Sequence, residues 1–326
     1  MSPDLLHSVP GTFRYVECAV CQTVYQNPRV REEDLPLCYP ADYFTHAGEL
    51  VWEGHPATRG SLRDLVKRAV RHAADAVPEP GLRAPVRFLG RVLALHPGLR
   101  RRARLGLVDG LAPPPGAKRR CLEVGPGFGL DLWRLSQLGW EAFGLDVDPV
   151  AAGNARARSG CEVRVGTLAS TDYPAGHFDL VYMSHVFEHL SDPVRAAERC
   201  LELLAPGGRL VLVYPNPAAL TARIHGRFSC VFEPPRHLVL PSGVAVSNLL
   251  GRAGYVAVRA ASTARSAATY HAASRGLRAG LAWDWTRPRP PAPRDRVLGL
   301  LEAVAAVFVP VGEEIVVDAR KPGATG

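Results

Sequence analysis

The fold of this chain is decided by CLEVGPGFG at residues 121–129 and GLDVD at residues 144–148. The apolar run before Gly125 is short and has no helical period, which predicts a buried parallel strand. A glycine-rich turn then opens residues 130–138, which have the apolar spacing of a helix and end at Gly139. The sequence therefore predicts a strand, a loop and a helix that together hold a ligand.

Two features indicate that this ligand contains a nucleoside. Glycine lets the backbone approach a ligand closely, and Gly125, Gly127 and Gly129 stand one residue tighter than in the G-x-G-x-x-G turn of dinucleotide binders. Asp146 ends the next apolar run, where a carboxylate can accept hydrogen bonds from both hydroxyls of a ribose.

The pattern E-x-G-x-G-x-G at residues 123–129 resembles motif I of the class I S-adenosylmethionine-dependent methyltransferases. Further segments resemble the same family, in the expected order, and the later ones look like a subgroup that methylates small molecules. They are HFDLVYMS (177–184), LLAPGGRLVLV (203–213), YPN (214–216), PPRHL (234–238) and GEEIVVDARK (312–321). The resemblance covers roughly residues 118–321. It implies an α/β, Rossmann-like fold: a seven-stranded, mostly parallel sheet with an antiparallel last strand and helices on both faces.

Composition divides the chain into three parts. Residues 1–60 form a small cysteine-bearing N-terminal module, residues 61–116 a helical linker, and residues 117–326 the methyltransferase-like domain with an insertion at about 263–312. Apolar runs predict strands at 120–124, 141–146, 161–166, 178–184, 209–214, 255–262 and 314–320. We expect the insertion to lie over the carboxyl ends of the strands and to shape an acceptor pocket.

The resemblance also implies which residues bind S-adenosylmethionine. Glu123 and the glycine loop are expected at its amino-acid end, Asp146 at the ribose, and Val147, Thr167 and Leu168 around the adenine. The full predicted set is Glu123, Gly125, Pro126, Gly127, Gly129, Asp146, Val147, Thr167, Leu168 and Ser184.

The resemblance implies methyl transfer to an oxygen or a carbon of a small molecule. Such transfer from a sulfonium is an in-line displacement, and a weak nucleophile must also lose a proton. His185 directly follows the fourth predicted strand, Glu188 and His189 come next, and His237 lies in the PPRHL segment. Histidine suits a proton acceptor because its ordinary pKa lies near working pH. These four residues are the predicted catalytic group, and no metal ligand is assigned.

Other interpretations of the same residues remain open. His185 to His189 spells H-x-x-E-H, a pattern of some zinc proteases, but here it follows a parallel strand of a nucleoside-binding fold. A divalent ion on Glu188 and His189 that orients a catechol-like acceptor is one alternative. A pair that holds its helix through hydrogen bonds is another.

The N-terminal module resembles the second half of a zinc-ribbon leader found on some of these enzymes. Cys18 and Cys21 form one C-x2-C pair, whereas a structural zinc site needs four ligands. Cys38 with His46 or His55 would complete a site. The alternative is a knuckle that packing stabilises without metal.

Composition is that of a globular enzyme, with 47% hydrophobic and 21% charged residues. The formal charge is +8, and much of the basic excess lies in residues 59–120. A solvated arginine-rich surface is favoured there over a nucleic-acid site, because no aromatic RNA-binding motif accompanies the charge. The start of the chain lacks a secretory signal, and the apolar stretch 297–311 is interrupted by Glu302 and Pro310. We therefore expect a cytoplasmic protein with a small-molecule substrate, no membrane span and no nucleic-acid partner.

Two other functions compete with methyl transfer. A nicotinamide-dependent oxidoreductase is disfavoured by the glycine spacing and by the Pro-Gly-Gly turn at residues 206–208. A catalytically silent scaffold with a methyltransferase-like domain is the other. The sequence does not determine the acceptor, because sugars, quinone-like aromatics, polyketides and peptides all qualify. It does not determine the oligomeric state either.

Overall fold

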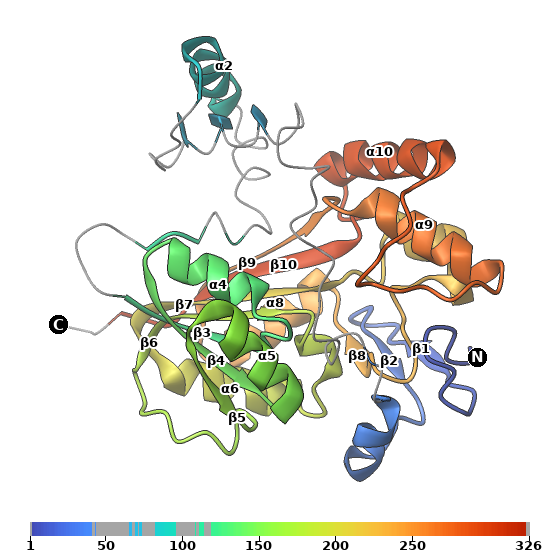
Figure 1. Cartoon of the computed structure of the whole chain (residues 1–326), viewed down its shortest axis with the longest axis horizontal. Coiled ribbons are helices and arrows are strands. Elements are labelled where there is room, and N and C mark those ends of the chain that lie inside the picture. Colours follow the sequence, from blue (N-terminus) through green and yellow to red (C-terminus); the bar gives the residue numbers. More distant parts are fainter. Residues whose placement is uncertain are drawn as a thin grey trace.

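The computed structural model describes residues 2–40, 43, 65–66, 69–70, 72–73, 82–95, 108, 111–113 and 119–323. A seven-stranded sheet in the order β5-β4-β3-β6-β7-β10-β9 lies at its centre (Figure 1). Its strands are β3 (Arg119–Val124), β4 (Trp140–Asp146), β5 (Glu162–Val165), β6 (Phe178–Ser184), β7 (Leu204–Pro215), β9 (Val256–Thr263) and β10 (Glu314–Arg320). All seven predicted strands are present.

The sheet is parallel from β5 to β7, and β10 runs antiparallel to both of its neighbours, β7 and β9. This confirms the predicted Rossmann-like topology with an antiparallel last strand. The other strand boundaries agree with the prediction to within one residue, but β7 begins at Leu204 rather than at Arg209. Leu204 pairs with Phe178, and pairing resumes only between Arg209 and Leu180, so the Pro-Gly-Gly segment is an irregularity inside the strand.

Helices cover both faces of the sheet because successive strand residues point to opposite sides. Cys121 and Leu180 pack against α4 and α5, whereas Leu122 and Val181 pack against α6 and α8. These helices are α4 (Leu130–Gln137), α5 (Pro149–Ser159), α6 (Pro193–Leu203) and α8 (Gly243–Arg252).

Two aspartates fix where helices begin. Asp148 accepts hydrogen bonds from the amides of the second and third residues of α5, and Asp192 does the same for α6. A proline follows each cap and is preorganised for the first helical position. The loops before these helices are therefore held at the carboxyl edge of the sheet.

A helical layer lies beyond β7, β9 and β10. It contains α7 (Leu220–His225), the short η5 (Gly226–Phe228), α9 (Ala267–Arg278) and α10 (Pro293–Phe308). Both α9 and α10 come from the predicted insertion. Tyr270 of α9 and the following Trp283 share one apolar cluster with Leu240, so the insertion packs against the loop before α8.

The N-terminal residues join the rest of the fold through a second sheet. Strands β1 (Tyr15–Glu17) and β2 (Val24–Gln26) form a hairpin, and β2 also pairs with β8 (Val239–Leu240) (Figure 1). The 3-10 helix η1 (Glu32–Cys38) follows, and the next residue, Tyr39, contacts His189 of the short helix η4 (Phe187–His189). Distant parts of the chain therefore build one structure around β8.

Of the helical linker, the structure describes α2 (Ala84–Ala94) and a few isolated residues. The remainder of residues 61–116, together with His46 and His55, lies outside the described residues. Within the described part of the chain, each helix is too short or too polar to cross a bilayer.

Candidate active site

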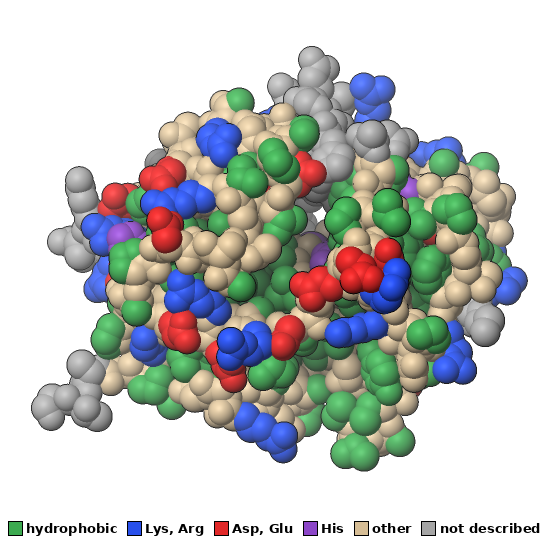
Figure 2. All heavy atoms as spheres, turned by 90° about the horizontal axis from the view of Figure 1, so that it is seen from below, with side chains coloured by type: hydrophobic (Ala, Val, Ile, Leu, Met, Phe, Trp, Pro, Cys, Tyr) green, Lys and Arg blue, Asp and Glu red, His purple; other side chains and the backbone are tan. Residues whose placement is uncertain are grey.

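A cavity of about 1840 Å³ opens at the carboxyl ends of β3, β4 and β6. Its wall includes nine of the ten predicted cofactor residues: Glu123, Gly125, Pro126, Gly127, Asp146, Val147, Thr167, Leu168 and Ser184. Gly129 is outside the wall. The surface drawn in Figure 2 is hollowed near its centre, between two bulky halves. The volume is enough for a nucleoside together with a second small molecule.

The glycine loop has a backbone that other residues adopt with difficulty. Gly125, Gly127 and Gly129 have φ values of +67°, +50° and +72°. A Cβ atom on Gly129 would lie 2.7 Å from Cα of Ala155 in α5, and one on Gly125 would lie 2.4 Å from a methyl group of Val186. The loop can therefore lie flat against the cavity only because these positions carry no side chain.

Replacing Gly129 with alanine is expected to lower the free energy of unfolding by roughly 2–5 kcal/mol, through the left-handed backbone and the clash with α5. Gly160 is a matched control, since its φ is +69° and open space surrounds its Cβ position. Gly160→Ala should lose only about 1–2 kcal/mol. Urea denaturation of both variants measures the difference, and equal losses would contradict the close approach of the loop to α5.

Asp146 connects the second strand to the glycine loop. Its Oδ2 accepts a hydrogen bond from the Gly127 amide at 3.3 Å, and its Oδ1 accepts one from the Asp148 amide at 3.0 Å. The carboxylate is thus held by backbone donors at the end of β4, in the cavity wall. This is the position from which a carboxylate can take both hydroxyls of a ribose.

Glu123 is a buried acid beside two other acids. Burial, followed by the charges of Asp131 and Asp146, raises the pKa of Glu123 well above its ordinary value. Its Oε2 has no hydrogen-bond partner among the described residues. A buried carboxyl in this position is suited to a cationic group. The ammonium of S-adenosylmethionine would supply that charge, so the residues present fit this cofactor.

The His185 ring lies between two carboxylates and is not free in the cavity. Its Nε2 is 3.0 Å from Oε1 of Glu314, and its Nδ1 is 3.5 Å from Oε1 of Glu188. Burial lowers the pKa of His185, but the two glutamates outweigh burial and raise it to about 10. A histidine that already carries its second proton at neutral pH is unsuited to accept another.

His189 and His237 present free lone pairs. Nδ1 of His189 lies 3.1 Å from the carbonyl oxygen of Arg236, and Nδ1 of His237 lies 2.7 Å from that of Val231. A carbonyl only accepts, so Nδ1 of a neutral ring donates to it and Nε2 keeps the lone pair. The Tyr39 hydroxyl also lies 3.1 Å from Nδ1 of His189 and can accept there. Burial also lowers the pKa of His189 to about 4, against the opposing effect of Glu188. Both rings line the cavity.

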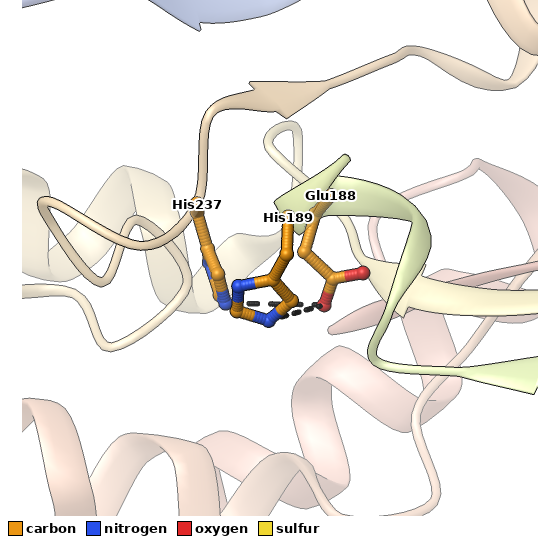
Figure 3. Close-up of side chains that lie close together, drawn as sticks. All are labelled: Glu188, His189 and His237. Atoms are coloured by element: carbon orange, nitrogen blue, oxygen red, sulfur yellow. Dashed lines mark ion pairs between the residues drawn. The ribbon is translucent and has the colours of Figure 1, made fainter. Parts of the chain in front are cut away.

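Glu188 lies behind the two rings and is fully buried. Its Oε1 is 4.0 Å from Nε2 of His189 and 3.8 Å from Nε2 of His237. Burial raises the pKa of Glu188, but the surrounding histidines lower it below its ordinary value. The structure therefore brings together Glu188, His189 and His237, although Glu188 and His237 are 49 positions apart in the sequence (Figure 3).

The N-terminal residues hold the loop that carries His237. The Tyr15 hydroxyl donates to the carbonyl oxygens of Phe232 and His237, and Gln26 Nε2 donates to that of His237 at 3.1 Å. Next to His237, the fully buried Arg236 pairs with Asp4 at 2.9 Å. The position of a predicted catalytic residue therefore depends on contacts more than 200 residues away in sequence.

Several cavity residues were not singled out from the sequence, although the insertion that carries Trp285 was expected to shape the acceptor pocket. They are Tyr39, Tyr43, Arg265, Tyr270, Trp285 and Glu314. The two tyrosines belong to the YPADY segment of the leader, and Trp285 belongs to the insertion, so only a general aromatic signal marked them. Arg265 directly follows β9 and pairs with Glu314 at the start of β10, a contact that only the antiparallel pairing of those strands creates.

The cysteines of the leader lie in the turn between β1 and β2, where the Cys18 amide donates to the Thr23 carbonyl. Both thiols are free, and Cys21 Sγ lies 3.2 Å from the Thr23 hydroxyl. Among the described residues, no third histidine, cysteine or acid joins them in a group that could hold a metal. The structure thus offers no support for zinc at this turn.

Comparison with known proteins gives one family match. A model described as "Methyltransferase domain" matches residues 98–260, half of the chain. A "Ubiquinone biosynthesis O-methyltransferase" from Xanthomonas axonopodis pv. citri is 34% identical over 131 residues, 38% of this chain and 54% of that protein. A "Probable S-adenosylmethionine-dependent methyltransferase" from Mycolicibacterium smegmatis is 34% identical over 103 residues, 31% of this chain and 39% of that protein.

Among solved structures, phosphoethanolamine N-methyltransferase 2 of Haemonchus contortus, in complex with S-adenosylmethionine, is 14% identical. The matched region covers 66% of this chain and 51% of the Haemonchus contortus chain, with a TM-score of 0.46. The chain spans about half the length of the curated ubiquinone-pathway relative it matches.

Proposed function

This chain belongs to the methyltransferase domain family, and we propose from that premise that it transfers the methyl group of S-adenosylmethionine to an oxygen of a small-molecule acceptor. One observation carries the proposal: a single cavity holds both the nucleoside-directed acids, Glu123 and Asp146, and the lone-pair-bearing rings of His189 and His237. The name of the Xanthomonas relative supports an oxygen acceptor. Tyr39, Tyr43, Tyr270 and Trp285 in the wall favour an acceptor with an aromatic or apolar body.

The cofactor supplies an electrophilic methyl group: the acceptor oxygen forms the new O–C bond, the S–C bond breaks, and sulfur keeps that electron pair. The residues of this chain bind and orient the cofactor and the acceptor, and they remove a proton from the acceptor. Glu123 and Asp146 fix the cofactor at the carboxyl ends of β3 and β4. His237 Nε2 has a free lone pair and lines the cavity, so we assign it the acceptor's proton, rather than His185.

Asp146→Ala is expected to weaken S-adenosylmethionine binding by about 100-fold, because two hydrogen bonds to a charged acceptor are worth about 3 kcal/mol together. Equilibrium dialysis with the labelled cofactor measures the change. Asp179→Ala is the matched control, since Asp179 lies at the opposite end of the sheet, near the start of β6. An Asp146 variant that binds like the control would remove the ribose assignment.

The transfer itself is tested by incubating the protein with methyl-labelled S-adenosylmethionine and a panel of phenols, sugars and primary alcohols. We expect label in a hydroxylated aromatic acceptor, with one equivalent of S-adenosylhomocysteine for each methyl group transferred. Label that appears only in amines or only in sugars would contradict the proposed acceptor class.

A further inference from the structure

The Glu188, His189 and His237 side chains form a group with the donor atoms of a metal site. One ligand atom from each lies within 4.8 Å of the other two. Figure 3 shows both rings turned toward the Glu188 carboxylate, with η4 contributing two of the residues and the loop before β8 the third. No other group of this kind occurs among the described residues.

The rings are oriented as metal-binding histidines usually are. Each Nδ1 donates to a backbone carbonyl, that of Arg236 for His189 and that of Val231 for His237. Such hydrogen bonds fix the ring and direct the Nε2 lone pair toward a metal. In His237 the 2.7 Å bond leaves the ring little freedom to turn away.

The carboxylate supplies a second, independent observation. Glu188 is fully buried, and neither of its side-chain oxygens has a hydrogen-bond partner among the described residues. A buried carboxylate normally accepts several hydrogen bonds or binds a cation. Its histidine neighbours lie at 3.5–4.0 Å, beyond the usual hydrogen-bond length. Both oxygens therefore keep lone pairs that no hydrogen bond among the described residues occupies.

We propose that Glu188, His189 and His237 bind one divalent transition-metal ion, of the kind that imidazole and carboxylate select together, such as Zn²⁺, Fe²⁺ or Co²⁺. Two nitrogens and one oxygen disfavour Mg²⁺ and Ca²⁺, which take oxygen ligands. Metal–ligand bonds of about 2.0–2.2 Å imply donor separations of roughly 3.3 Å in a tetrahedron. The observed separations, 3.8 and 4.0 Å from the carboxylate oxygen and at most 4.8 Å overall, therefore require the donor atoms to close on the ion by up to about 1.5 Å.

Three protein ligands leave an open coordination position, and both histidines line the cavity. An acceptor hydroxyl bound there would ionise more readily, because a metal ion lowers the pKa of a bound oxygen acid. In the metal-loaded protein this ionisation would replace the proton transfer to His237, because the metal then occupies the His237 lone pair, and the proton would leave to solvent. This use of the site rests on the proposed function, whereas the metal site itself does not.

The test is titration of the full chain with Co²⁺, followed by visible d–d absorption. The Cys18→Ser, Cys21→Ser double variant serves as the starting protein, so that thiolate binding at the leader turn does not contribute. We expect one Co²⁺ per chain. Glu188→Gln and His189→Gln, in the same background, should each weaken binding more than about 100-fold, beyond the 10- to 100-fold that the loss of a supporting residue costs. His177→Gln, a histidine at the other end of β6, should have no effect.

Absence of 1:1 binding in the starting protein would overturn the proposal, and this result does not depend on whether the variants fold. Binding that is unchanged in folded Glu188→Gln would overturn it as well. A parallel titration with S-adenosylmethionine separates the two proposals. Cofactor binding without a cobalt site removes only the metal, whereas a cobalt site without cofactor binding removes only the methyltransferase function.

Discussion

His237→Ala is expected to lower kcat by about 10²- to 10⁴-fold, the usual contribution of a positioned proton acceptor. The ring is almost fully buried and its Nε2 carries the free lone pair, while its Nδ1 is used by the Val231 carbonyl. A bound metal would not change the direction, because the same atom would then be a ligand. Steady-state release of S-adenosylhomocysteine with the identified acceptor measures the effect.

The loss should appear in kcat and not in the affinity for S-adenosylmethionine. Glu123 and Asp146 belong to β3 and β4, whereas His237 lies in the loop before β8. His177→Ala is the control for removing an imidazole elsewhere. A His237→Ala enzyme with kcat within threefold of the unaltered protein would show that the ring is a loop anchor.

Arg236→Met is expected to lower the free energy of unfolding by about 3–5 kcal/mol, the usual result of leaving buried charges without their partner. Arg236 is fully buried and pairs with Asp4 and Glu233, each at 2.9 Å. Burial raises the pKa of Asp4, but the hydrogen bonds and charge of Arg236 bring it below its ordinary value. Both acids are therefore charged in the native state, and in the variant they lose the partner that offsets the cost of their burial.

Urea denaturation measures this change, and an exposed arginine provides the matched comparison. Arg195 pairs with Glu198 on the surface of α6, with 80% of the arginine side chain exposed. Arg195→Met should therefore change stability by less than about 1 kcal/mol. Adding Asp4→Asn and Glu233→Gln to Arg236→Met should restore much of the loss, because no unpaired charge is then buried. Similar losses in the two single variants would contradict the role of Arg236.

The parallel core was predictable because its strands are buried on both faces. Such strands appear as short apolar runs between turns, and β6 has the bounds that its run predicts, Phe178–Ser184. The start of β7 was not predictable from Pro206 and Gly207, which are typical of turns. Pairing of Leu204 with Phe178 extends the strand around them, which is a tertiary effect that overrides local preference.

The cofactor side of the cavity was more predictable than the catalytic side, for a topological reason. Glu123 and Asp146 end neighbouring parallel strands, and such ends meet at one edge of a sheet. His185 also ends a strand, yet its two carboxylate neighbours come from η4 and β10. Only one of them, Glu188, is near it in sequence, so its protonation could not be inferred from its neighbours along the chain.

The contacts between the N-terminal module and the rest of the chain are still harder to predict from the sequence. Asp4 and Arg236 are 232 positions apart, and nothing local to either marks them as a pair. The same holds for Tyr39, which reaches His189 across the interface with η1. Long-range polar contacts of this kind depend on the completed fold, in which β8 adds to the N-terminal hairpin.

Calorimetric titration of the purified protein with S-adenosylmethionine, S-adenosylhomocysteine and NADH tests the central claim most directly. We predict saturable 1:1 binding of the two sulfur nucleosides and no heat of binding with NADH, because Glu123 faces the cavity as an unpaired acid suited to an ammonium group. Binding of NADH alone, or of none of the three, would contradict the assignment of this cavity to S-adenosylmethionine.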